Sequence, residues 1–142
     1  MLEIGVWRGP FFLPPGNWHG TVLYAPEELQ RCPWELLLLR HPVPQGIRCA
    51  CRVLLFSSEL PEATLRCVSA ERVVSFGLFT RDSLTLAAMG EQKVISLQRE
   101  LQTLSGRLID PQELPLPTGW GGDDVQLLLA QAGLSLLLDL IV

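Results

Sequence analysis

The chain has 142 residues, of which 48% are hydrophobic and 18% charged, and its formal net charge is −4. This length suits one ordinary domain, and the apolar fraction exceeds that of a disordered chain. The negative charge and the lack of a basic run argue against nucleic-acid binding. We therefore expect a single globular domain over residues 1–142.

The sequence predicts neither an export signal nor a membrane span. Residues 1–8 lack the basic start and the long apolar run of a signal peptide. The most apolar stretch, 125–142, contains Gln126, Gln131 and Asp139, and an acidic side chain is costly inside a bilayer. We expect a cytoplasmic protein whose four cysteines are reduced thiols.

The first part of the chain predicts two short strands, over 2–8 and 19–24. Between them, the segment 10–20 places aromatic residues among prolines and glycines, which is typical of turns. Pro26 and the two glutamates after it predict a helix start, because proline fits the first turn and carboxylates suit its positive end. Pro33 ends this helix.

The clearest strand signals are the apolar runs 34–40 and 47–56. The six residues between them include two prolines and a glycine, which indicates an antiparallel hairpin. A symmetric hairpin places Glu35 opposite Arg52, so that opposite charges meet on one face. This register is a specific prediction, because a shift of one residue would separate the charges.

Two thiols, Cys49 and Cys51, share one face of the second run because side chains alternate along a strand. The hairpin register sets them opposite Leu38 and Leu36, and Cys67 could join them from the next strand. We interpret these thiols as small hydrophobic side chains in a core, a common role of free cysteine. The alternative is a zinc site, although the usual pair of Cys-x-x-Cys motifs is absent.

The middle of the chain predicts further strands over 72–79 and 83–89. The segment 63–69 fits either a strand or a helix that starts after Pro61. Over 91–109 the hydrophobic period lengthens to three or four residues, which is typical of an amphipathic helix with one narrow apolar seam. The residues of this seam are Val94, Leu97, Leu101, Leu104 and Leu108.

The C-terminal part begins with a proline- and glycine-rich linker over 110–122. Asp123 is a favourable N-cap and predicts a helix over 125–132. Gly133 is expected just after the end of this helix, and 134–142 is expected to form a last buried strand.

The candidate recognition sites are two apolar surfaces, since the sequence contains no nucleophile elbow and no His-Glu-x-x-His motif. Aromatic side chains on a rigid loop often anchor protein partners. The predicted partner-binding residues are Phe11, Phe12, Trp18 and His19 of the aromatic loop, and Val94, Leu97, Leu101 and Leu104 of the helix seam. The alternative is structural, with the rings closing the open end of the sheet and the seam covering one face.

The sequence therefore predicts an α+β fold, with a mainly antiparallel sheet of five to seven strands, one long amphipathic helix and a short C-terminal helix. A partly open β-barrel with an added helix is the alternative. The expected function is non-catalytic: a protein–protein interaction or accessory subunit, or a homodimer, that needs no cofactor and no metal. Two other functions remain open: a small enzyme or ligand-binding domain with a pocket at the open end of the sheet, and a metal-binding protein that uses the thiols.

Overall fold

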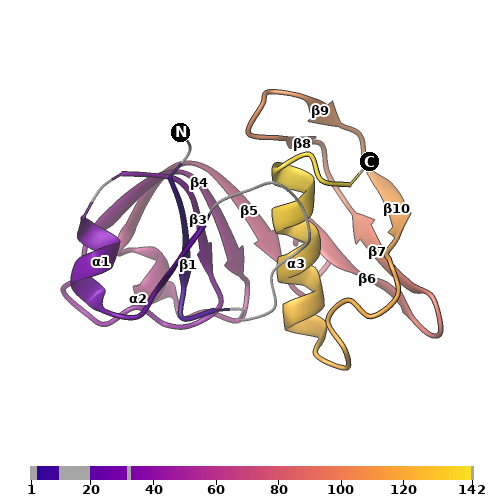
Figure 1. The fold of residues 1–142 in the computed structure, drawn as a ribbon, viewed down its shortest axis with the longest axis horizontal. Coiled ribbons are helices and arrows are strands. Elements are labelled where there is room, and N and C mark those ends of the chain that lie inside the picture. Colours follow the sequence, from indigo (N-terminus) through magenta and orange to yellow (C-terminus); the bar gives the residue numbers. More distant parts are fainter. Residues whose placement is uncertain (1–2, 10–19, 32, 142) are drawn as a thin grey trace.

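The computed structural model describes residues 3–9, 20–31 and 33–141, and its main feature is one mixed sheet (Figure 1). The sheet has 8 strands in the order β10-β7-β6-β5-β4-β3-β1-β2. Its strands are β1 (Ile4–Trp7), β2 (Thr21–Leu23), β3 (Trp34–Leu39), β4 (Cys49–Ser57), β5 (Val68–Phe76), β6 (Leu84–Met89), β7 (Lys93–Leu97) and β10 (Gln112–Pro115). The other elements are the strand pair β8 (Leu101–Gln102) and β9 (Leu108–Ile109) and the helices α1 (Pro26–Gln30), α2 (Glu62–Leu65) and α3 (Val125–Leu137).

The sheet is mostly parallel. The strands from β2 through β1, β3, β4 and β5 to β6 pair in parallel, and β7 and β10 extend the sheet with antiparallel pairs. The chain is α+β, but the predicted mainly antiparallel sheet is wrong. The barrel alternative is wrong as well, because the strand order is open and ends at β2 and β10.

The predicted hairpin between 34–40 and 47–56 is instead a parallel crossover. Trp34 lies opposite Cys51 and Leu36 opposite Val53, so the predicted pairing of leucines with thiols is wrong. Nearly every residue of β3 is buried, whichever face it points to. That is the pattern of a parallel strand covered on both faces, and the four consecutive leucines of β3 are typical of such a strand.

The predicted helix over 91–109 is wrong, because this segment forms β7, β8 and β9. In β7 the buried residues are Ile95 and Leu97, two apart, so the relevant period is that of a strand. β7 pairs with β6 on one side and with β10 on the other. These long-range pairs override a spacing of three and four residues that suited a helix.

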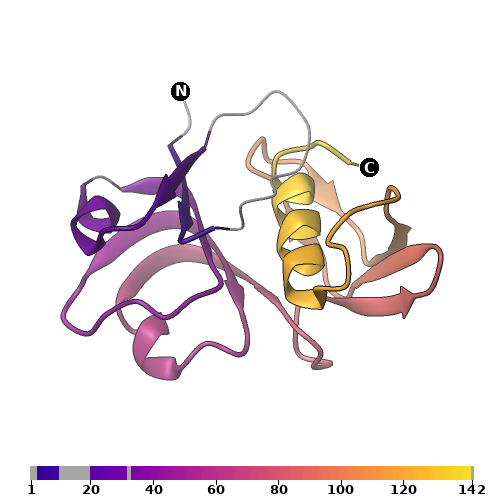
Figure 2. The same ribbon diagram turned by 60° about the horizontal axis from the view of Figure 1, so that its bottom comes forward.

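Both faces of the sheet are covered by hydrophobic clusters. The larger cluster joins α3 to the sheet and includes Leu55, Phe76 and Leu84. The smaller cluster includes Leu29 of α1 and Trp34 of β3. Figure 2 shows α3 standing apart from α1 and α2, with strands of the sheet between them. The protein is thus built as three layers, with short helices on one side and α3 on the other.

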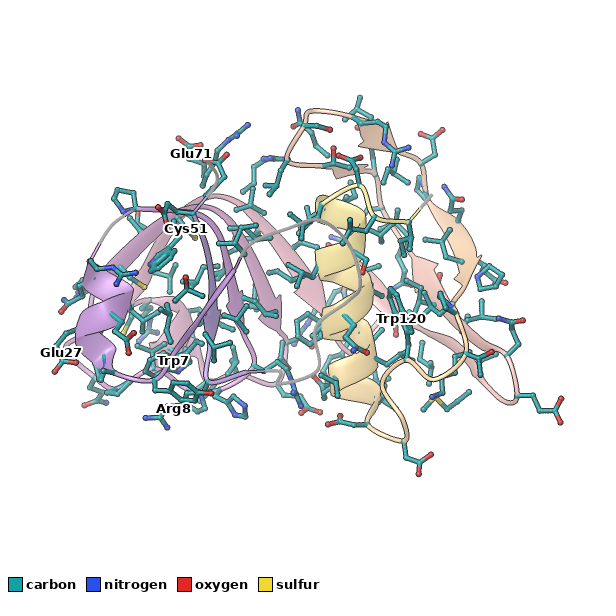
Figure 3. The ribbon with its side chains drawn as sticks, viewed as in Figure 1. Trp7, Arg8, Glu27, Cys51, Glu71 and Trp120 are labelled. Atoms are coloured by element: carbon teal, nitrogen blue, oxygen red, sulfur yellow. The ribbon has the colours of Figure 1, made fainter. Side chains whose placement is uncertain are left out.

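The three strands β3, β4 and β5 share one charged row, formed by Glu35, Arg52 and Glu71. Arg52 forms ion pairs with Glu35 and, at 3.9 Å, with Glu71. The predicted contact between Glu35 and Arg52 is therefore confirmed, although it joins parallel strands. In Figure 3 Glu71 projects outward from the sheet, whereas Cys51 lies within it.

The side-chain alternation of β4 changes at this charged row. Cys49 and Cys51 belong to the smaller cluster, whereas Val53 and Leu55 belong to the larger one. Residues two apart in a regular strand stay on one face, so β4 must be irregular near Arg52. The ladders from β4 to β3 and to β5 have no paired residue at this position.

The C-terminal helix is confirmed, but it is longer than predicted. α3 begins after Asp124, whose carboxylate accepts a hydrogen bond from the Leu127 amide (3.1 Å). It continues through Gly133 to Leu137, so the predicted stop at Gly133 and the predicted last strand over 134–142 are wrong. In the part of the chain that the structure describes, no helix has the length and apolar character to cross a membrane.

Gly133 allows α3 to approach two distant strands closely. A Cβ atom at this position would come within 2.9 Å of a Leu55 methyl group on β4 and within 3.0 Å of a Leu84 methyl group on β6. Both leucines are fully buried. A larger residue at this position would therefore force the helix away from the sheet or shift both leucines.

Replacing Gly133 by alanine is expected to lower the free energy of unfolding by roughly 1–2 kcal/mol, because overpacking outweighs the better helix propensity of alanine. Denaturant-induced unfolding followed by circular dichroism measures this change. Gly90→Ala is the matched control, since a Cβ atom at Gly90 meets nothing within 4 Å. Equal stability of the Gly133→Ala variant and the wild type would contradict the close packing of α3.

Candidate functional site

The two predicted recognition surfaces have different outcomes. Phe11, Phe12, Trp18 and His19 lie outside the described residues, and their role in partner binding stays a prediction. The seam residues are in separate elements: Val94 and Leu97 in β7, Leu101 in β8, and Leu104 in the turn after it. Leu97, Leu101 and Leu104 are buried in the larger cluster, so they do not form an exposed seam. Partner binding by these seam residues stays untested.

A third surface lies between β5 and β6, because these two strands are paired only at one end. Their ladder consists of the pair Phe76 and Leu84, whereas β5 pairs with β4 along almost its whole length. β6 then turns away from β5 toward β7 (Figure 1). Among the described residues, one edge of β5 is therefore left without a partner in the middle of the sheet.

The strand pair β8–β9 forms the opposite wall of this opening. Together the walls enclose a groove of about 310 Å³, called the β5 groove below. The residues that line the β5 groove include Arg72, Val73, Val74, Arg99, Gln102 and Leu108. Val73 and Leu108 are 61% and 58% exposed, although both are large apolar residues.

The β8–β9 wall is fixed to the end of α3. The Leu104 amide donates to the Leu137 carbonyl oxygen (2.9 Å). The Asp139 carboxylate accepts from Ser105 Oγ (2.6 Å) and from Arg107 Nε (2.9 Å). These contacts, led by the Ser105 hydrogen bond, lower the pKa of Asp139. The wall is thus anchored to the end of α3 by a charged pair and a backbone hydrogen bond.

Arg72 connects the two walls of the β5 groove. Its Nη1 donates to the Gln102 carbonyl oxygen (2.9 Å) and to Gln102 Oε1 (3.3 Å). Its Nη2 is buried and has no hydrogen-bond partner among the described residues. An unsatisfied donor of this kind costs free energy until a partner reaches it. Arg99 adds a second positive charge to the lining, and Glu100 a single negative one.

The open edge also exposes hydrogen-bonding groups of the backbone. The Phe76 carbonyl oxygen accepts from Ser58, next to β4, whereas the Gly77 amide donates to Leu84 of β6. Successive residues of a strand point their backbone groups to opposite sides. Counting back from Gly77, the backbone groups of Val73 and the amide of Ser75 therefore face the opening, whereas the Ser75 carbonyl is engaged by β6 through the Phe76–Leu84 pair.

The thiols are a second chemical cluster, and they are buried as predicted. Burial, aided by the neighbouring thiols, raises the pKa of Cys49 to about 11 and that of Cys51 to about 12. The interpretation of Cys49, Cys51 and Cys67 as core residues is confirmed. Within residues 3–9, 20–31 and 33–141, no group of three His, Cys, Asp or Glu side chains is arranged to hold a metal ion.

A third cluster lies at the carboxyl ends of β1 and β3, where open parallel sheets often bind ligands. Arg8, Arg40 and His41 are found there, at the end of the molecule opposite Cys51; Figure 3 labels Arg8 and Cys51. Partial burial, together with Arg40 and Arg8, lowers the pKa of His41. Arg40 is bound by Asp124 at 3.2 Å. The groups acting on His41 are thus cations, whereas a histidine base is usually oriented by a carboxylate.

The β5 groove was not found by sequence reasoning. The segment 72–79 was identified as a strand, but nothing in it showed which of its edges would be paired. The available signal was Val73 next to Val74, because adjacent apolar residues in a strand must face opposite sides. One of the two had to lie outside the core or be covered by another layer.

In a Cys32→Ser background, the three buried thiols are expected to react with Ellman's reagent at least about 100-fold more slowly in the folded protein than in denaturant, because burial shields them from the reagent. Absorbance of the released chromophore measures this rate. Rapid reaction of all three thiols in the folded protein would contradict their burial.

The raised pKa values of Cys49 and Cys51 also predict that the free energy of unfolding falls as pH rises from about 9 to about 12. In this range the thiols of the unfolded chain lose their protons at a lower pH than those of the folded protein.

Hydrogen exchange is expected to separate neighbouring amides of β5. The amides of Val73 and Ser75 face the opening and should exchange quickly, while those of Arg72 and Val74 face β4 and should exchange at least about 100-fold more slowly. Nuclear magnetic resonance of the labelled protein in heavy water resolves the four amides. Uniform protection along β5 would show that its edge is already covered.

In comparisons with known proteins, no family model, no curated protein and no solved structure matches this chain.

Proposed function

We propose that this protein is a non-catalytic interaction domain and that a protein partner binds in the β5 groove. The observation that carries the proposal is Val73, a large apolar side chain that is 61% exposed on an interior strand of the sheet. It lies beside an unpaired strand edge. Folded proteins usually cover such edges, and exposed apolar patches mark interaction sites.

The polar side chains elsewhere support a binding role more than a catalytic one, because they are engaged in structural contacts. The buried carboxylate of Asp82 accepts hydrogen bonds from Ser58 Oγ and from the Phe79 amide, both at 3.0 Å. Arg40 is bound to Asp124. A catalytic nucleophile needs a lowered pKa or an adjacent base, whereas Cys49 and Cys51 have raised pKa values.

The Val73→Glu variant tests this proposal, because a charge at this position disfavours apolar contact with a partner. Affinity purification from the native cell, with quantitative mass spectrometry, should show at least one protein that the wild type enriches and that Val73→Glu retains about tenfold less. The signal of the chain itself is included, so that self-association is scored in the same way.

Leu78→Glu is the matched control, since Leu78 is also 61% exposed but does not line the β5 groove. It should retain the same partners as the wild type. Both variants should unfold at the wild-type temperature, because both side chains are on the surface. Retention of every partner by Val73→Glu would refute the proposal.

A further inference from the structure

We infer that the β5 groove takes an extended segment of a partner protein, which adds as a strand to the open edge of β5 and points an acidic side chain toward Arg72. The inference rests on the proposed function, that a protein partner occupies this groove. It specifies the conformation and the charge of what binds there.

The backbone of β5 supplies the first reason. The amide and carbonyl of Val73 and the amide of Ser75 face the opening, while β6 pairs with β5 only at Phe76. An added strand satisfies both donors and the Val73 acceptor at once, which is how β-augmentation gives affinity without a particular sequence. A helix or a folded surface would leave these groups to water.

The shape of the groove supplies the second reason. The β8–β9 pair stands opposite β5, so the open edge lies inside a groove and not at the rim of the sheet. The volume of about 310 Å³ is close to the lower limit of ligand pockets, which is about 300 Å³. This space suits one extended segment, whereas the wall blocks edge-to-edge contact with a second folded sheet.

The two faces of an added strand would meet different surroundings. Val73 and Val74 point to opposite faces, because one is exposed and the next is buried in the larger cluster. Arg72 shares the face of Val74, two residues away. Side chains of the segment on the Val73 face would cover exposed methyl groups, so apolar residues are favoured there.

Charge decides what the segment carries on the Arg72 face. Nη2 of Arg72 is buried without a partner, while Nη1 of the same guanidinium is bound to Gln102. Arg99 and Arg72 place two positive charges in the lining against the single carboxylate of Glu100. A carboxylate would satisfy the free donor through a charge-assisted hydrogen bond, whereas a lysine would meet like charge. The preferred segment is therefore acidic.

Two blocked peptides of about seven residues serve as probes. One reads Val-Thr-Val-Glu-Val-Thr-Val, and the other has Lys in place of the central Glu. Titration up to about 1 mM, followed by amide resonances of the labelled full chain, should show saturable binding of the Glu peptide. The amides of Val73 and Ser75 should shift and become protected from exchange. The Lys peptide should bind at least about tenfold more weakly.

The Arg72→Gln variant keeps a hydrogen-bond donor on this face of β5 but removes the charge. It should bind both peptides and lose the preference between them, while its folded spectrum away from the groove stays unchanged. Equal binding of the two peptides by the wild type would overturn the acidic preference. Absence of saturable binding, or binding that leaves Val73 and Ser75 unprotected, would overturn strand addition.

The outcome for the proposed function is separate. If Val73→Glu loses a cellular partner but neither peptide binds, the groove takes a protein in another way and only the strand inference fails. If Val73→Glu keeps all its cellular partners, the proposed function itself fails.

Discussion

The constraint on which the structure depends is the close packing of α3 over two parts of one sheet. The parallel part ends at β5 and the antiparallel part begins at β6, and they share the single pair Phe76 and Leu84. Backbone hydrogen bonds alone would leave this joint weak. Gly133 lets the helix backbone lie directly on Leu55 of one part and Leu84 of the other, so that hydrophobic burial joins them instead.

The same arrangement produces the β5 groove. Because α3 covers the joint from one side and anchors β8–β9 through Leu137 and Asp139, the two parts stay together although β5 is unpaired along one edge. An ordinary sheet would close this gap with strand pairing. Here the helix makes pairing unnecessary for stability, so the backbone groups of Val73 and the amide of Ser75 remain available to another chain.

The sequence predicted local elements well and their assembly poorly. Pro26 and Asp123 predicted the helix starts through short-range chemistry, and the observed cap Asp124 lies one residue after Asp123. The Glu35–Arg52 pair was found because opposite charges select a neighbour. The direction of that pairing was not predictable, since a proline- and glycine-rich connection suits a hairpin and a crossover alike. The helix prediction for 91–109 was wrong because leucines at helical spacing also occur where strands and turns alternate. The β5 groove exists because one edge of β5 lacks a partner strand. Which edge is unpaired depends on the arrangement of all the strands, so the local sequence of β5 does not predict it.

The charged row of Glu35, Arg52 and Glu71 has a consequence for how this chain tolerates insertions and deletions. The side-chain alternation of β4 changes near Arg52. Before it, Cys49 and Cys51 face the smaller cluster, and after it Val53 and Leu55 face the larger cluster. Loss of one residue near Arg52 would leave each half of β4 on its present face, but it would shift the register of one half against β3 and β5 by one residue. Since β3 and β5 meet β4 at the same row, their lengths on either side of it are coupled. These strands can change length there only together, whereas substitutions of single residues remain independent.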